Sequence, residues 1–143
     1  MFFAVLVTSA VSRGGAVTRR FEIRVGEDAA RAELLDDDAP DICNAFYDAL
    51  PIQGFCVHAK FAGEELIMML PFLAGPQNEI LDVVPGDIGY YPGRQTACMF
   101  YGETEPFGHV SVFARVTENL EAFQGWGRAA LAGGSVDMRL AAI

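Results

Sequence analysis

The sequence lacks the short motifs by which many enzymes bind a cofactor, hold a metal or activate a nucleophile. It contains no G-x-S-x-G, no phosphate-binding G-x-x-x-x-G-K-[ST], no G-x-G-x-x-G and no H-E-x-x-H. Its two histidines, His58 and His109, lie far apart in the sequence and are too few to indicate a metal site. We therefore expect no metal and no cofactor. Because these motifs are absent, the sequence does not identify a reaction.

Long apolar runs and internal repeats are also missing. No segment approaches the roughly 18 to 20 apolar residues that a helix needs to span a bilayer, and no period of about 20 to 50 residues recurs. Because 52% of the residues are nevertheless hydrophobic, we expect a soluble globular protein without a membrane partner. Cys43, Cys56 and Cys98 are odd in number and lie in or beside apolar runs, which is typical of reduced core cysteines and favours a cytoplasmic location.

Positive charge is scarce. Ten lysines and arginines stand against 19 aspartates and glutamates, so the net charge is −9. Residues 1–24 carry four arginines and one glutamate, which leaves the rest of the chain still more acidic. An acidic body repels phosphate backbones, and we therefore expect no nucleic-acid partner.

The N-terminal segment differs in character from the rest. MFFAVLVTSAVS resembles the apolar part of a secretory signal, but it lacks a preceding basic region and a clear A-x-A cleavage site. SRGGAVTRR has the composition of a flexible lead-in. We expect residues 1–18 to be a leader, with a native segment, a signal and a mis-set start all left open. Residues 19–143 then form one domain, since the whole chain has one domain's length.

A hairpin followed by a helix is predicted in the first third. Apolar residues alternate with charged ones at 21–25, and a second apolar strand at 31–35 follows the turn GEDAA. The aspartates at 36–38 turn the chain into solvent because carboxylates are costly to bury. Pro40 suits a first helical turn, since its φ is preset and it has no N–H to leave unpaired, and apolar residues at helical spacing continue until Pro51.

The remaining chain is predicted to be mostly strands. In residues 55–61, Phe55, Val57, Ala59 and Phe61 alternate with Cys56, His58 and Lys60, and we expect the first set to face the core. Further strands are indicated at 64–70, within 83–93, at 96–102, at 109–116 and from 135 onwards. In the strand at 109–116 we expect the valines to face the core and Phe113 and Arg115 to lie on the other face. A helix beginning near Thr117 or Asn119 runs towards Leu131. Eight or so short strands with two helices predict a mainly β protein: a closed or nearly closed eight-stranded barrel whose two mouths are capped by the helices.

One stretch resembles a known family. Residues 33–46 have the order E-L-[apolar]-x-D-x-[apolar]-P with Phe six places after the proline, and this order resembles the cyclophilin signature around the first helix. The phrases APDICNAFYDALP, HAKFAGEELI, PGDIGYYPG and FYGETEPFG are similar to bacterial cyclophilin-like proteins of unknown function. The resemblance implies a cyclophilin-like barrel over most of the chain.

The resemblance does not extend to prolyl isomerase chemistry. Cyclophilins carry Phe-His-Arg on the strand after the first helix, and the arginine stabilises the twisting prolyl amide. With His58 on the family's histidine, Ala59 stands where that arginine belongs, and residues 63–70 lack the family's glutamine and paired glycines. Arg94 and Arg115 are the candidates to replace the missing guanidinium, although their spacing does not require it. We therefore carry over the fold and doubt the activity.

Candidate ligand-binding residues follow from their chemistry and position. His58 belongs to the barrel exterior or to a groove on it, and Glu65 is expected to face the same groove, because adjacent Glu64 and Glu65 point to opposite faces of a strand. Arg94, on a Pro-Gly turn, is either an exposed loop residue or an anion clamp. The other candidates are aromatic residues and the polar residues of one strand: Tyr91, Tyr101, Phe107, His109 and Arg115.

Three functions fit these observations. The first is a protein that binds a small molecule or a short peptide in a groove on the barrel wall. The second is an enzyme in which His58 or His109 acts as general base and Arg94 or Arg115 neutralises charge on a small amide or carboxylate. The third is a regulatory or structural subunit, including a homo-oligomer, held through exposed Phe107, Tyr91 and Trp126.

Overall fold

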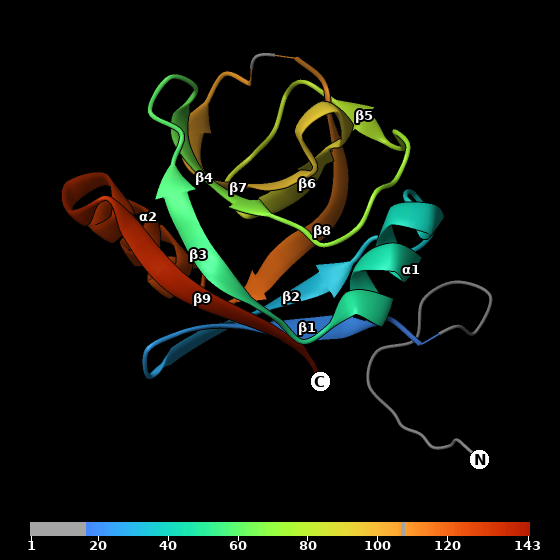
Figure 1. Ribbon diagram of the computed structural model, residues 1–143, viewed down its shortest axis with the longest axis horizontal. Coiled ribbons are helices and arrows are strands. Elements are labelled where there is room, and N and C mark those ends of the chain that lie inside the picture. The colour runs from blue at the N-terminus through green and yellow to red at the C-terminus, as the bar shows by residue number, and fades with distance from the viewer. Residues whose placement is uncertain (1–16, 107) are drawn as a thin grey trace.

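The computed structural model describes residues 17–106 and 108–143, in which strands are combined with two α-helices (Figure 1). Residues 1–16 of the expected leader, and the candidate Phe107, lie outside the described residues. The elements are β1 Arg20–Val25, β2 Asp28–Leu34, α1 Pro40–Ala49, β3 Ile52–His58, β4 Gly63–Met69, β5 Glu79–Ile80, β6 Asp87–Tyr91, the 3₁₀ helix η2 Pro92–Arg94, β7 Thr96–Thr104, β8 Val110–Glu118, α2 Leu120–Gly133 and β9 Ser135–Ala142.

Eight strands close into an antiparallel barrel. Neighbours pair in the order β2-β1-β9-β3-β4-β7-β6-β8, and β8 pairs back with β2. β5 lies outside this ring and pairs with Val110 and Ser111, beyond the part of β8 that β2 covers. The expected closed barrel with two helices is therefore confirmed, with β5 as an addition where the sequence indicates only a loop.

The two helices lie on opposite sides of the barrel and bury their apolar faces in one core (Figure 1). Phe46 of α1 packs edge-on against Phe21, with ring centroids 4.7 Å apart, and lies 5.0 Å from the ring of Phe113. Phe123 and Trp126 of α2 enter the same core from the other helix. This burial explains why short helices form here, since most helical stability in proteins comes from packing an apolar face.

The face expected for residues 55–61 is wrong for Phe55, Val57 and Phe61, whereas Ala59, which follows β3, is buried as expected. β3 buries Ile52 and Cys56, whereas Phe55 is 61% and Phe61 64% exposed. The register with β9 is the cause, because Ile52 lies opposite Leu140, and Leu140 is itself a core residue. Residues at every second position from Ile52 therefore face inwards.

The faces expected for the strand at 109–116 also need correction. Phe113 is completely buried in the main core, although we expect it outside. Val110 and Val112 instead join Cys98 and Phe100 in a second, smaller apolar cluster. On β7, Cys98 and Phe100 alternate with residues of the main core, so this second cluster lies on the outer face of the wall. Ile80 and Val83, from the segment between β4 and β6, pack onto the cluster from outside.

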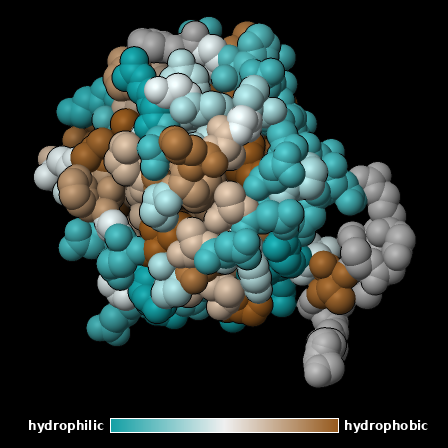
Figure 2. All heavy atoms as spheres, turned by 45° about the vertical axis from the view of Figure 1, so that its right-hand side comes forward, coloured by the Kyte–Doolittle hydropathy of each residue, from teal (hydrophilic) through white to brown (hydrophobic). Residues whose placement is uncertain are grey.

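Several large apolar side chains remain at the surface. Phe55, Val57, Phe61, Met69 and Leu73 are the exposed apolar residues from β3, β4 and the segments after them. Figure 2 shows apolar residues gathered in the middle of one face, with hydrophilic residues around them. Neither α-helix of the described chain is long and apolar enough to cross a membrane.

Candidate functional site

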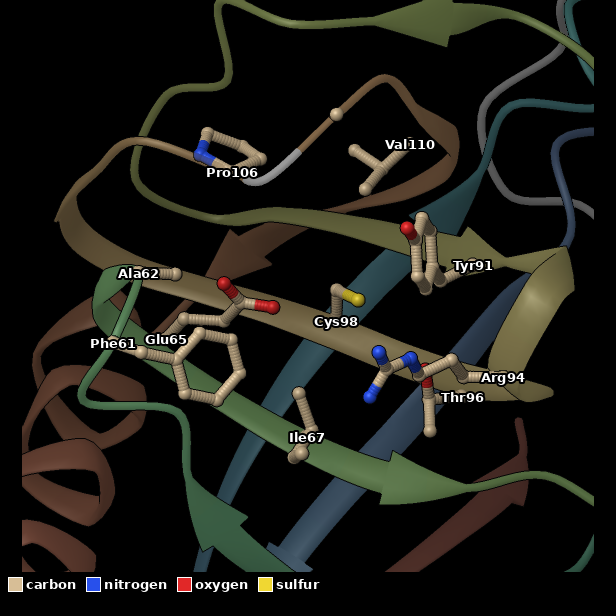
Figure 3. A pocket seen from close by; sticks show the side chains of 11 residues that line it. Phe61, Ala62, Glu65, Ile67, Tyr91, Arg94, Thr96, Cys98, Pro106 and Val110 are labelled. Atoms are coloured by element: carbon tan, nitrogen blue, oxygen red, sulfur yellow. The ribbon is translucent and has the colours of Figure 1, made fainter.

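A pocket of about 240 Å³ opens on the outer wall of the barrel (Figure 3). Its floor is made by neighbouring strands, where Ile67 of β4 lies opposite Cys98 of β7 in the register. The loops after β3, β6 and β7 form its sides. The residues that line it are Phe61, Ala62, Glu65, Ile67, Tyr91, Arg94, Thr96, Cys98, Pro106, Gly108 and Val110.

The pocket lies beside the outer apolar cluster. Cys98 and Val110 belong both to the cluster and to the pocket lining, while Ile67 and Tyr91 pack against the cluster. An outer strand face normally carries polar residues, but here the segment that contains β5 covers part of the wall and keeps it dry. The pocket is the uncovered end of this apolar surface, and its volume is below the roughly 300–1,000 Å³ typical of sites for drug-sized ligands.

Glu65 supplies a carboxyl group inside this apolar lining. The residue is only 6% exposed, and its side chain points into the cavity in Figure 3. Burial raises the pKa of Glu65 above its usual value, and a hydrogen bond from the Cys98 thiol partly opposes the shift. No cationic side chain among the described residues pairs with Glu65.

Cys98 is not a candidate nucleophile. Burial raises the pKa of its thiol, and the neighbouring Glu65 carboxylate raises that pKa further, while a hydrogen bond with Thr96 opposes the shift. The thiolate is the nucleophilic form of cysteine, so these surroundings disfavour the reactive form. Cys98 is buried and free, as expected of a core cysteine, although the residue also contacts the pocket.

Arg94 supplies the opposite charge. It is the last residue of η2, in the turn between β6 and β7, and its guanidinium extends over the cavity (Figure 3). The following residue, Gln95, has a φ of 56° and exchanges hydrogen bonds of 2.7 and 3.0 Å with Leu70, which fix the turn. Within residues 17–106 and 108–143, no carboxylate forms an ion pair with Arg94. Its exposed side chain is therefore available to an anion.

His58 lies on the other face of the wall, away from the pocket. It is opposite the core residue Leu66, and its Nε2 is 2.6 Å from the Tyr101 hydroxyl beneath α2. Burial, followed by the charge of Lys60, lowers the pKa of His58, which favours the neutral ring. The expectation that His58 and Glu65 share a groove is therefore wrong, because adjacent positions on β4 point to opposite faces.

The remaining predicted residues have other surroundings. Arg115 donates from Nε to Asp87 at 2.9 Å, and that carboxylate is almost fully buried. His109 is exposed between two residues that line the pocket, but it does not line the pocket itself. Trp126, expected as an exposed anchor, is 6% exposed and belongs to the core.

Tyr91, Arg94 and Glu65 are thus the sequence candidates that the structure brings together around one cavity. The apolar lining residues Ile67, Cys98 and Val110 were missed as site residues. Their signal in the sequence is that of ordinary buried strand residues. Only the loops around them distinguish a pocket from a continuous core.

A family model matches residues 22–142 and is described as a protein of unknown function, DUF3830. The chain belongs to this family. No curated protein matches the DUF3830 chain. Among solved structures, it is similar to the hypothetical protein AF2241 from Archaeoglobus fulgidus, with 21% identity, a TM-score of 0.70, and coverage of 92% of this chain and 100% of that one.

A second similar structure is McbB in complex with tryptophan. The identity is 15% and the TM-score 0.77, over 85% of the DUF3830 chain and 44% of the McbB chain. The match therefore spans less than half of McbB. At these identities the two likenesses show a shared fold and nothing about the ligand.

Proposed function

We propose that this cyclophilin-like barrel binds a compact, largely apolar small molecule that carries a carboxylate, in the pocket on its outer wall. The observation that carries the proposal is Arg94, a guanidinium on a hydrogen-bonded turn beside an apolar cavity, without an acidic partner in the described chain. A planar guanidinium matches a carboxylate with two parallel hydrogen bonds. The apolar lining then accepts the rest of the ligand.

Two features support this choice over the alternatives. The volume of about 240 Å³ suits a metabolite better than a peptide. The McbB structure, part of which shares this fold, is a complex with tryptophan, a compact aromatic carboxylate. That likeness is a reason to include indole and phenyl carboxylates among the first compounds tested.

A thermal-shift screen tests the proposal. Small aromatic and branched carboxylates are compared with their neutral amides, since a ligand that binds only the folded state raises the melting temperature. Arg94→Gln is expected to weaken the best carboxylate about 10- to 100-fold, the range for a hydrogen bond to a charged group. Arg139→Gln, at an exposed arginine on β9, is the control. Equal binding of acids and amides, or equal loss in both variants, would contradict the proposal.

An enzyme is the second candidate, and Glu65 is the observation in its favour. A buried carboxyl group with a raised pKa is typical of residues that transfer protons. The histidines expected for this role do not line the pocket. If the ligand found by screening is turned over, Glu65→Gln should abolish turnover while binding persists.

A further inference from the structure

The pocket carries opposite charges at its two ends. Glu65 lies opposite Phe100 on β7, whereas Arg94 follows β6, at the end where Tyr91 lies opposite Thr96. Phe100 is four positions after Thr96, so the backbone positions at these two ends are roughly 13 Å apart along the strand. Figure 3 shows both side chains directed towards the cavity, with Cys98 between them. No ion pair joins them.

The carboxylate end lacks a partner suited to its charge. A buried carboxylate is normally paired with a cation or held by several hydrogen bonds. Glu65 receives one weak donor, the Cys98 thiol, and no cation from the described residues. A ligand that brings an ammonium group to this end supplies the missing partner.

We infer that the pocket recognises amino acids with apolar side chains, the ammonium group binding Glu65 and the carboxylate binding Arg94. The side chain of the ligand lies against Ile67 and Val110. This inference rests on the proposed function, because it shares the carboxylate site at Arg94, and it adds the ammonium requirement at Glu65. The ligand is electrically neutral overall, and each of its charges is paired with the opposite charge of one residue.

Matched sets of compounds separate the contribution of the ammonium group from that of the carboxylate. Phenylalanine carries both, 3-phenylpropionate only the carboxylate and phenethylamine only the amine. Leucine, 4-methylpentanoate and 3-methylbutylamine form a second set with a branched apolar part. Titration calorimetry at pH 7 is expected to give at least tenfold tighter binding for an amino acid than for either partner compound of its set.

Variants assign each charge to its residue. Glu65→Gln should bring phenylalanine and 3-phenylpropionate to the same affinity, and Arg94→Gln should do the same for phenylalanine and phenethylamine. Glu64→Gln is the matched control, because Glu64 is the neighbouring residue, is exposed and bonds the backbone N–H of Glu103 through its own carboxylate. It should leave the order of the probes unchanged.

A proton measurement gives a second readout. An ammonium group that binds Glu65 expels the proton from the fraction of carboxyl groups that are protonated, so binding releases protons in acidic buffer. Calorimetry at pH 5 in buffers of different ionisation enthalpy should detect this release in the wild type and not in Glu65→Gln.

The possible outcomes separate the inference from the proposed function. If the acids bind as tightly as the amino acids and Arg94→Gln weakens both, the carboxylate site stands and the ammonium inference is overturned. If the amines bind tightly and Arg94→Gln has no effect, the proposed function fails as well. Absence of binding by both complete sets overturns the inference, while the wider carboxylate screen still decides the proposed function.

Discussion

Glu65 lies in surroundings that disfavour its charged form. Its carboxyl group is buried in a mainly apolar pocket, and burial raises its pKa. The folded protein therefore holds the proton to a higher pH than the unfolded chain does. The protonated form contributes stability below the unfolded pKa, and that contribution is lost as the pH rises through the raised folded value.

Replacement of Glu65 by glutamine should remove the free-energy cost of burying a charged carboxylate. At pH 7 we expect Glu65→Gln to increase the free energy of unfolding by on the order of 1 kcal/mol, because a neutral amide is cheaper to bury than a carboxylate. The increase should shrink as the pH falls towards 4.5. Thermal unfolding followed by circular dichroism between pH 4 and 8 measures it. Glu27→Gln, in the exposed β1–β2 turn, controls for the loss of one charge, and a gain that does not depend on pH would contradict the explanation.

At the scale of elements, helix α2 is shaped by two glycines with different surroundings. Gly127 is buried, and a Cβ there would lie 2.4 Å from the ring of Tyr101. Gly125 is exposed, and a Cβ there meets nothing within 4 Å. Close approach of α2 to the strand that carries Tyr101 thus requires glycine only at position 127.

Alanine substitutions should separate the two positions. Gly125→Ala is expected to stabilise the protein by up to about 1 kcal/mol through helix propensity. Gly127→Ala should destabilise it by about 1–3 kcal/mol, since the Tyr101 ring must move. Urea unfolding measures both. The same sign for the two variants would show that helix propensity, and not the contact with Tyr101, governs both positions.

The first turn of α1 depends on a residue from a distant loop. Ala39, at the N-cap, forms no side-chain cap, and the backbone N–H groups of Asp41 and Ile42 instead donate to Gln77 Oε1 at 2.9 and 3.2 Å. These bonds tie the segment between β4 and β6 to the helix.

Gln77→Ala should therefore act like the loss of a helix cap. We expect a loss of about 0.5–2 kcal/mol in unfolding free energy. Gln77→Glu, which keeps the acceptor, should retain part of that stability, and the comparison uses the same urea titration. Equal stability of the alanine variant and the wild type would show that solvent replaces the cap fully.

For the whole molecule, the barrel alone does not predict prolyl isomerase activity. The resemblance to cyclophilins places Ala59 where that family has its arginine, whereas in the structure Arg94 lies over the outer pocket and Arg115 is paired with Asp87. The two arginines considered as substitutes therefore do not complete a site around His58.

We consequently expect no acceleration of prolyl isomerisation above the uncatalysed rate. A protease-coupled assay on a model proline peptide measures this, with a cyclophilin as positive control. Activity comparable to that control would require a catalytic arrangement different from the one described here.

The local sequence was enough to predict the two α-helices and the eight strands of the barrel, but not β5. The hairpin at 20–34, the Pro40 helix start and the closing strand follow from periodicity and turn chemistry, which act over neighbouring residues. Asn119 was also predicted as a helix start, yet its side chain donates to the Ala29 carbonyl rather than capping α2. Local sequence was enough to place the start of the helix near Asn119. It could not identify Ala29 as the hydrogen-bond partner, because Ala29 is distant in the sequence.

The tertiary structure alone decided which faces are buried and where the pocket lies. Cys56, and not Phe55, faces inwards because β9, some 80 residues later, sets the register of β3. Glu65 and Arg94 meet one cavity because β4 and the β6–β7 turn converge on β7. Alternation along a strand defines two faces, but only the packing of distant strands and loops determines which of them is dry.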